Sequence, residues 1–230
     1  MNMITPNARP NGSRLHVFDM DGTLLRSTAT IELARHLGHL DRGQEIETLW
    51  GEGRISDTDF WRALLEICDG ATDADFDKAF ASSPWMAGVA EVFADITARG
   101  EAAIVISQSP TFFVERLKTW GAHETYGSDV VPGAPLSDTA TLLPEAKVEI
   151  TRAALTARGL GAADCVAYGD SSSDVELFKS FANTIGVNPS ATLSKLATVE
   201  YRGTDMREAY RLGRDLIGQN DRQNINQDNT

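Results

Sequence analysis

The sequence has few or none of the features on which several classes of protein depend. Its 230 residues include two cysteines, Cys68 and Cys165, at no metal-ligand spacing, so we expect neither a disulfide nor a cysteine-ligated metal. No run of about 18 apolar residues occurs, which argues against a membrane-spanning helix. The first residues, 1–11, have no apolar stretch of the signal-peptide kind. We therefore predict a cytoplasmic protein without a membrane partner.

Basic residues are also scarce relative to acidic ones. The chain has 21 Lys and Arg against 33 Asp and Glu, which gives a net charge of −12. Because phosphate backbones need a basic face, we expect no nucleic-acid partner. A small phosphorylated substrate stays compatible with this charge, since a bound metal ion reverses the local field. Both ends of the chain, residues 1–11 and 218–230, are polar and are predicted to be flexible.

Short apolar runs alternate with helical patterns through most of the chain. The runs "RLHVF", "AAIVI", "DCVAY" and "NTIGV" are apolar on both faces, as parallel strands covered by helices are. Residues 27–83 contain several amphipathic segments and no convincing strand. We therefore predict an α/β fold: a Rossmann-like parallel sheet core, residues 12–26 and 84–217, with a helical cap, residues 27–83, inserted after the first strand.

Acidic and hydroxyl residues follow three of the predicted strands. Asp19 and Asp21 end the first strand, Ser107 ends the second, and Asp170 follows the third, with Asp174 shortly after it. Ligands of open α/β sheets bind beyond the carboxyl ends of the strands, where these groups would meet. A cluster this acidic needs a hard cation with oxygen ligands, and Mg²⁺ fits best.

The sequence does not match three other cation- or phosphate-binding motifs. An EF-hand loop that starts at Asp19 would need an acid or amide, a glycine and a glutamate where the chain has Thr23, Leu24 and Thr30. Neither G-x-G-x-x-G nor a P-loop is present. The expected counter-charge is Lys147, which opens a predicted helix before the third strand.

The order "DMDGT", "VISQS", "EAKVE" and "GDSSSD" resembles the four motifs of the haloacid dehalogenase superfamily of phosphohydrolases. The long insertion after the first motif is most similar to the phosphoserine-phosphatase-like branch, and the resemblance covers residues 14–200. It implies a phosphatase that hydrolyses a small phosphate monoester with Mg²⁺ through an aspartyl-phosphate. Phosphotransfer to a second alcohol by the same intermediate and a catalytically vestigial binding protein are the alternatives.

The resemblance also implies roles for single residues. Asp19 would be the nucleophile and a metal ligand, and Asp21 the general acid and base, with its main-chain carbonyl on the metal. Asp170 would be a further metal ligand. The groups that would bind the phosphate are Ser107, the backbone N–H of Gln108, and Lys147. The supporting residues would be Thr23, Ser173 and Asp174.

The residues that would read the substrate depart from the phosphoserine phosphatase pattern. Thr28 stands where that branch has a glutamate for the substrate ammonium, and Leu64 where it has an arginine for the carboxylate, with Arg62 nearby. We therefore expect a neutral or more apolar small ester to be preferred over phosphoserine, with phosphoserine phosphatase proper as the alternative.

Aromatic residues in or beside the cap are a further source of specificity. They are Trp50, Phe60, Trp61 and Trp85. Most should form the cap core. One or two are candidates to face an apolar leaving group. The flap expected between Gly127 and Pro144 is short.

Overall fold

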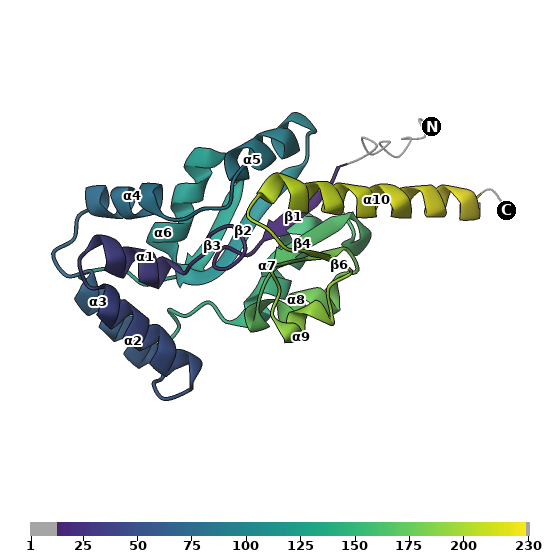
Figure 1. Cartoon of the computed structure of the whole chain (residues 1–230). Helices are drawn as coiled ribbons and strands as arrows, with labels where there is room; N and C mark the ends of the chain where they lie inside the picture. Colours follow the sequence, from purple (N-terminus) through teal and green to yellow (C-terminus); the bar gives the residue numbers. More distant parts are fainter. Residues whose placement is uncertain (1–12, 229–230) are drawn as a thin grey trace, which may run out of the picture.

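A six-stranded parallel sheet forms the centre of the protein (Figure 1). The computed structural model describes residues 13–228. The strands are β1 (Leu15–Phe18), β2 (Ala102–Pro110), β3 (Glu124–Ser128), β4 (Cys165–Gly169), β5 (Thr184–Val187) and β6 (Val199–Tyr201). They lie in the order β3-β2-β1-β4-β5-β6, so β1 is central and pairs with both β2 and β4. The predicted α/β fold is confirmed.

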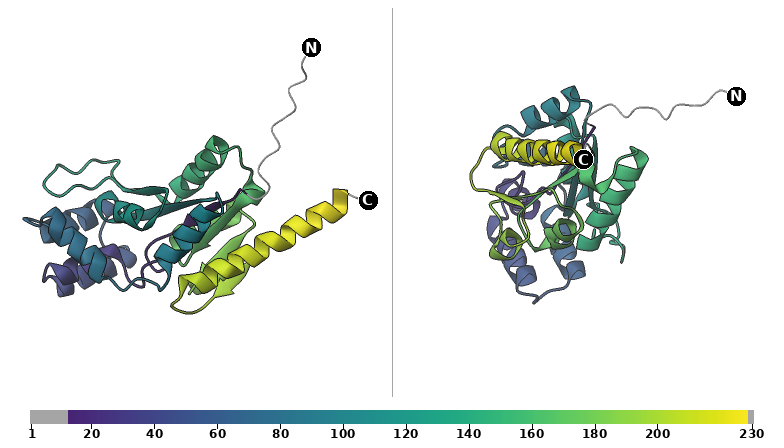
Figure 2. Two further views of the ribbon diagram at one scale, coloured as in Figure 1. Left: turned by 90° about the horizontal axis from the view of Figure 1, so that it is seen from above. Right: turned by 90° about the vertical axis from the view of Figure 1, so that its right-hand side faces the viewer.

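Helices cover both faces of the sheet. Outside the cap they are α5 (Val89–Ala98), α6 (Thr111–Val114), η1 (Glu115–Trp120), α7 (Pro144–Ala157), η2 (Ala162–Asp164), η3 (Ser172–Asp174), α8 (Val175–Ser180), α9 (Ala191–Ser194) and α10 (Met206–Asp228). Successive side chains of β1 alternate between the faces. Leu15 and Val17 pack with α7 and α8, whereas Phe18 packs with α5 and α10. Figure 2 shows α7 and α10 on opposite sides of the sheet.

The cap follows the first strand and is built from helices. These are α1 (Ala29–His36), α2 (Leu40–Gly51), α3 (Asp57–Ile67) and α4 (Asp73–Ser82). Hydroxyl residues start three of them: Thr28 and Ser56 accept hydrogen bonds from N–H groups of the first turn, and Thr72 forms a capping box. In Figure 1 these helices lie beyond the end of the sheet toward which β1 points.

Two strands and one strand end differ from the expectation. β3 and β6 lie at the edges of the sheet, and their sequences "ETYGS" and "VEY" contain no continuous apolar run that would mark them. β2 continues to Pro110, with a register shift between Ile106 and Pro110. Ser107 therefore lies inside a strand and not at its end.

The C-terminal segment also differs. Residues 218–230 were expected to lack regular structure, but α10 continues to Asp228. Residues 219–228 contain neither glycine nor proline, so nothing in their backbone chemistry ends the helix. The predicted flexible segment 1–11 and residues 229–230 lie outside the described residues.

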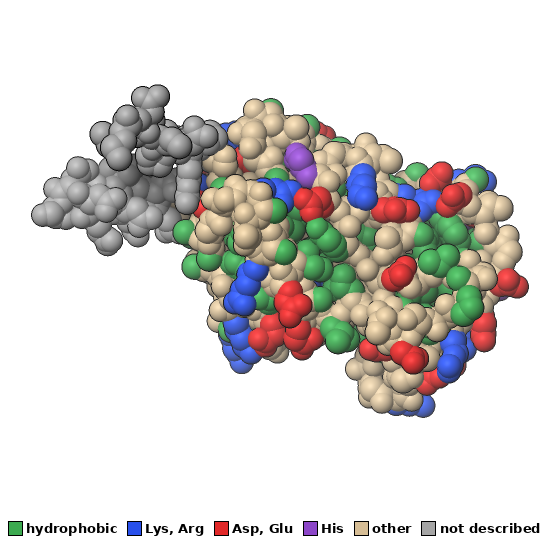
Figure 3. Space-filling view, turned by 180° about the vertical axis from the view of Figure 1, so that it is seen from behind, with side chains coloured by type: hydrophobic (Ala, Val, Ile, Leu, Met, Phe, Trp, Pro, Cys, Tyr) green, Lys and Arg blue, Asp and Glu red, His purple; other side chains and the backbone are tan. Residues whose placement is uncertain are grey.

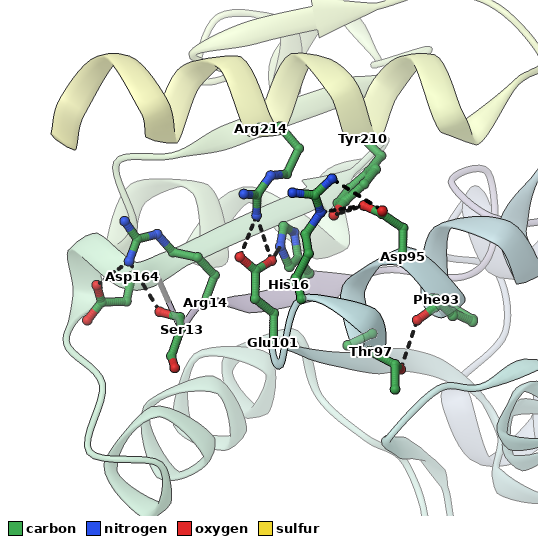
Figure 4. A network of polar contacts seen from close by, with 12 residues as sticks. Ser13, Arg14, His16, Phe93, Asp95, Thr97, Glu101, Asp164, Tyr210 and Arg214 are labelled. Carbon is green, nitrogen blue, oxygen red and sulfur yellow. Dashed lines mark hydrogen bonds and ion pairs between the residues drawn. The ribbon is translucent and has the colours of Figure 1, made fainter. Parts of the chain in front are cut away.

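A buried polar network joins α10 to the amino-terminal side of the sheet (Figure 4). His16 of β1 is fully buried, with Nε2 2.9 Å from Glu101 Oε2 and Nδ1 3.2 Å from the hydroxyl of Tyr168. Arg214 of α10 donates to both oxygens of Glu101, at 2.5 and 2.6 Å. A second bond joins α10 to α5, where the Tyr210 hydroxyl donates to Asp95 Oδ2 at 2.9 Å. The network therefore ties α10 to β1 and α5 through buried or partly buried polar groups.

The surface in Figure 3 carries Lys and Arg side chains among Asp and Glu side chains. Charges of both signs are therefore mixed on that face of the described chain. Among the described helices, none combines the length and apolar character needed to cross a membrane.

Candidate active site

The loop after β1 brings the first carboxylate to the end of the sheet. Asp19 follows the strand directly, and its N–H continues the ladder by donating to Tyr168 O at 2.9 Å. Its side chain is almost fully buried. Gly22 then turns the chain with φ of 79°, a left-handed conformation that favours glycine. A Cβ at this position would lie 2.2 Å from Asp170 Oδ2, so this glycine also makes room for the second carboxylate.

Lys147 reaches the same point from the first turn of α7. Its Nζ donates to Asp19 Oδ1 and to Asp174 Oδ1, both at 2.7 Å, and to Ser173 Oγ at 3.1 Å. The lysine is fully buried. Burial opposes its charge, but the two carboxylates outweigh this effect and raise the pKa of Lys147. The ammonium is thus a fixed counter-charge beneath Asp19.

Three carboxylates form a cluster that suits a hard metal ion. Asp19, Asp170 and Asp174 each offer an oxygen, and these oxygens lie within 4.8 Å of one another. Both carboxylate oxygens of Asp174 already accept hydrogen bonds. Oδ1 accepts from Lys147, and Oδ2 accepts from the N–H groups of Asp170 and Ser171. Asp170 Oδ1, in contrast, is buried and has no hydrogen-bond partner among the described residues. A cation between Asp19 and Asp170 would satisfy this oxygen.

The pKa values of this cluster reflect the crowding of like charges. Burial raises the pKa of Asp19 well above its ordinary value, and the charges of Asp174, Asp170 and Asp21 raise it further, against the opposing effect of Lys147. Burial, followed by the charge of Asp174, raises the pKa of Asp170 to about 7. In both carboxyl groups, burial and the neighbouring carboxylates outweigh the opposing charge of Lys147.

Asp21 stands apart from this cluster. Its Oδ2 accepts hydrogen bonds from Ser109 Oγ at 2.6 Å and Ser107 Oγ at 2.9 Å, and its Oδ1 accepts from Ala29 N at 2.7 Å. Burial raises the pKa of Asp21, although these hydrogen bonds partly oppose the shift. The raised pKa favours the protonated form that a general acid needs. Asp21 thus also links β2 to the first residue of the cap helix α1.

The remaining residues predicted to bind phosphate or support the site lie on β2 and in the loop after β1. Ser107 is fully buried and donates to Asp21, and Gln108 donates its side-chain amide to Leu142 O at 3.2 Å. Thr23 is fully buried, and its hydroxyl has no partner among the described residues. Ser109 was missed by the sequence analysis, because nothing in the local pattern shows that β2 continues past residue 107 and aims this hydroxyl at Asp21.

A cavity of about 480 Å³ opens over the site between core and cap. Asp19, Asp21 and Asp170 lie at its core end, and Gln108 and Ser109 line it from β2. The flap contributes one further lining residue, at position 141. The cavity is therefore large enough for a small ester next to the carboxylates.

Of the three residues predicted to determine specificity, one lines the cavity and two do not. Thr28 lines the cavity. Leu64 is fully buried in the hydrophobic core, and Arg62 is largely exposed and pairs with Asp59 at 3.3 Å. Neither Leu64 nor Arg62 lines the cavity, so the suggestion that they contact substrate is not supported. Arg26 lines the cavity instead.

A carboxylate from a second cap helix lies next to Thr28. Glu47 of α2 lines the cavity, and Thr28 Oγ1 donates to its Oε1 at 2.7 Å. The sequence analysis correctly found no negative charge at position 28 but missed the one bound to it. No sequence signal marks this contact, because it depends on how α1 and α2 pack.

Three of the four aromatic residues line the cavity. Trp50 is 37% exposed, whereas Phe60 and Trp61 are largely buried. The Trp61 indole donates to Thr141 Oγ1 of the flap at 2.7 Å. Trp85 packs in the core, where its indole donates to Phe80 O.

A parallel sheet with this aspartate loop, a buried lysine and a helical cap defines a hydrolase of the haloacid dehalogenase class. The family model described as haloacid dehalogenase-like hydrolase matches residues 16–179, so the chain belongs to this family. A curated phosphoserine phosphatase from Methanocaldococcus jannaschii is 24% identical over 205 residues, which are 85% of this chain and 95% of that protein.

Solved structures show the same fold. A phospho-aspartyl intermediate analogue of phosphoserine phosphatase superposes with a TM-score of 0.71 at 21% identity, over 87% of this chain and 99% of that one. A Bordetella pertussis protein of unknown function gives a TM-score of 0.66 at 18% identity, over 83% of this chain and 99% of that one. The cap and the core therefore occur together in these structures.

Proposed function

We propose that the protein hydrolyses a small phosphate monoester through an aspartyl-phosphate on Asp19, with Mg²⁺ as cofactor. The observation that carries the proposal is the division of the carboxylates. Asp19 lies against the buried Lys147 ammonium beside the unpartnered Asp170 oxygen, whereas Asp21 is held separately with a raised pKa. The similarity to phosphoserine phosphatases supports the reaction class.

Asp19 and Asp170 are the residues that would hold the metal ion. When bound, the cation neutralises the charge between the nucleophile and the phosphate dianion. The rest of the chemistry falls to the protein. An oxygen of Asp19 attacks phosphorus, and the bond from phosphorus to the leaving oxygen breaks. Asp21 gives its proton to that oxygen, so the product leaves as an alcohol.

The second half of the reaction uses the same residues. Asp21, now a carboxylate, takes a proton from a water molecule that attacks phosphorus, and inorganic phosphate leaves as Asp19 is regenerated. Lys147 keeps its charge throughout and offsets the charge of Asp19 and the transferring group. Ser107 and Ser109 hold the Asp21 carboxyl in place through their hydroxyl groups.

Phosphate release from a panel of monoesters tests this function. Wild-type protein should release phosphate with Mg²⁺ and stop in excess chelator, and Asp19→Asn should show neither turnover nor an acyl-phosphate trapped by hydroxylamine. Full turnover in chelator would disprove the metal dependence. A phosphorylated alcohol acceptor in place of free phosphate would show transfer rather than hydrolysis.

A further inference from the structure

The cavity carries more negative charge than its proposed chemistry uses. Five carboxylate residues line it, and Arg26 is the one basic residue among the described lining residues. The acidic residues are Asp19, Asp21, Asp170, Glu47 and Asp57. The first three belong to the reaction centre. Glu47 and Asp57 come from the cap, on the side where the leaving group of an ester would lie.

Of these two cap residues, Glu47 is the less exposed one, and a hydrogen bond holds it in position. Thr28 donates to its Oε1 at 2.7 Å, and the same hydroxyl accepts from Ile31 N at 3.3 Å, which ties it to the start of α1. No Lys or Arg of the described chain pairs with Glu47. Glu45 on the same helix, in contrast, pairs with Arg42 at 2.8 Å on the surface. Asp57 is exposed and accepts the Trp50 indole N–H at 2.7 Å.

The environment of Glu47 favours a cationic partner. Burial raises its pKa, the hydrogen bond from Thr28 opposes the shift, and the charge of Asp21 adds to it. A positive group on the substrate would offset both the burial and the neighbouring charge. An anionic leaving group would add to the repulsion.

Aromatic rings line the same cavity as this carboxylate. Trp50 lies one turn after Glu47 on α2, and its ring centroid is 5.3 Å from that of Phe60. Phe60 is in turn 5.0 Å from Trp61, edge to face. The hydrogen bonds of Trp50 to Asp57 and of Trp61 to Thr141 orient both indoles. Aromatic faces next to a carboxylate are the surroundings in which proteins bind organic cations.

From these contacts, and on the basis of the proposed phosphatase function, we infer that Glu47, Trp50, Phe60 and Trp61 form a subsite for an ammonium group. The substrate class is then a phosphate monoester of an amino alcohol that has no carboxylate. The absence of a carboxylate is inferred because Leu64 is buried and Arg62 is on the surface with Asp59. Among the described lining residues, Arg26 is then the one basic group, and the experiment below tests it. The inference replaces the neutral leaving group expected from Thr28 with a cationic one.

Two esters of equal chain length test the subsite. 2-Aminoethyl phosphate carries an ammonium where n-propyl phosphate carries a methyl group. With Mg²⁺, the wild-type ratio of kcat/KM should favour the amine at least about tenfold, since a hydrogen bond to a charged group is worth about 10- to 100-fold. Glu47→Gln should bring this ratio close to one. The matched control Glu45→Gln, which removes the same charge from the exposed face of α2, should keep it.

Binding separates this inference from the proposed function. In Asp19→Asn protein with Mg²⁺, calorimetry should give a lower Kd for 2-aminoethyl phosphate than for n-propyl phosphate, and adding Glu47→Gln should abolish the difference. If the difference persists while no ester is hydrolysed by the wild type, the subsite stands and the phosphatase function fails. If hydrolysis occurs without preference for the amine, the subsite is disproved. If O-phosphoserine exceeds 2-aminoethyl phosphate, the restriction to substrates without a carboxylate is wrong and Arg26 binds that group.

Discussion

Replacing Lys147 with methionine should show how strongly the site depends on one buried charge. Methionine has a similar length and no charge, so the change removes the ammonium and keeps most of the packing. Asp19 and Asp174 then lose the partner that lies 2.7 Å from each of them. Both carboxylates are buried, so water cannot replace the lost partner without opening the core.

The magnitude follows from this burial. Removing one partner of a buried ion pair destabilises a protein by about 3–5 kcal/mol, because a charge remains buried without compensation. For a protein of this size the loss corresponds to a fall in Tm of about 10 °C. Turnover should fall by at least about 100-fold, since Lys147 offsets the charge of Asp19 and the transferring group.

Urea unfolding of wild-type and Lys147→Met protein without metal measures the first quantity, and phosphate release measures the second. Lys179→Met is the matched control. Its ammonium is exposed and pairs with Glu176 at the surface, where an ion pair contributes about 0–1 kcal/mol. Mg²⁺ should raise the Tm of Lys147→Met more than that of the wild type, because the cation replaces the missing charge.

A loss of less than about 1 kcal/mol in Lys147→Met would refute this reasoning. It would mean that the carboxylates take up protons or water at little cost. Unchanged turnover in a folded Lys147→Met protein would refute the role of Lys147 next to the nucleophile.

Three further perturbations test other parts of the structure. Asp21→Asn should slow alkyl phosphates far more than aryl phosphates in single-turnover assays, because only poor leaving groups need its proton; equal losses would contradict the acid role. Burial lowers the pKa of His16 against the opposing effect of its partner, so the unfolded chain binds a proton below about pH 6.5 that the folded chain does not. In urea titrations, the free energy of unfolding of the wild type relative to His16→Gln should therefore decrease as the pH is lowered below about 6.5, by up to about 1.4 kcal/mol per pH unit; an equal pH dependence in both proteins would contradict this. Gly22→Ala should weaken Mg²⁺ affinity in calorimetry and destabilise the fold by about 1–3 kcal/mol, since a Cβ would strain φ and collide with Asp170; normal affinity would show that the loop adapts.

Much of the core could be predicted because its signals are local. The apolar run before Asp19 marks a buried strand, and parallel strands bring their carboxyl ends together, so the convergence of Asp19, Asp170 and Lys147 follows from the pattern. Helical periodicity and hydroxyl caps likewise predicted an all-helical insertion. The edge strands β3 and β6 escaped prediction, because half-exposed strands need no apolar run.

The sequence by itself therefore determined the fold class and the residues at the strand ends. Only the tertiary structure decided what surrounds the leaving group. Thr28, which precedes α1, and Glu47 of α2 are 19 residues apart, and Ser109 reaches Asp21 from 88 residues away. Such contacts depend on how α1 packs against α2 and on the side-chain rotamers within the cap. No periodic pattern encodes them, because a polar side chain that faces a cavity looks in sequence like one that faces solvent.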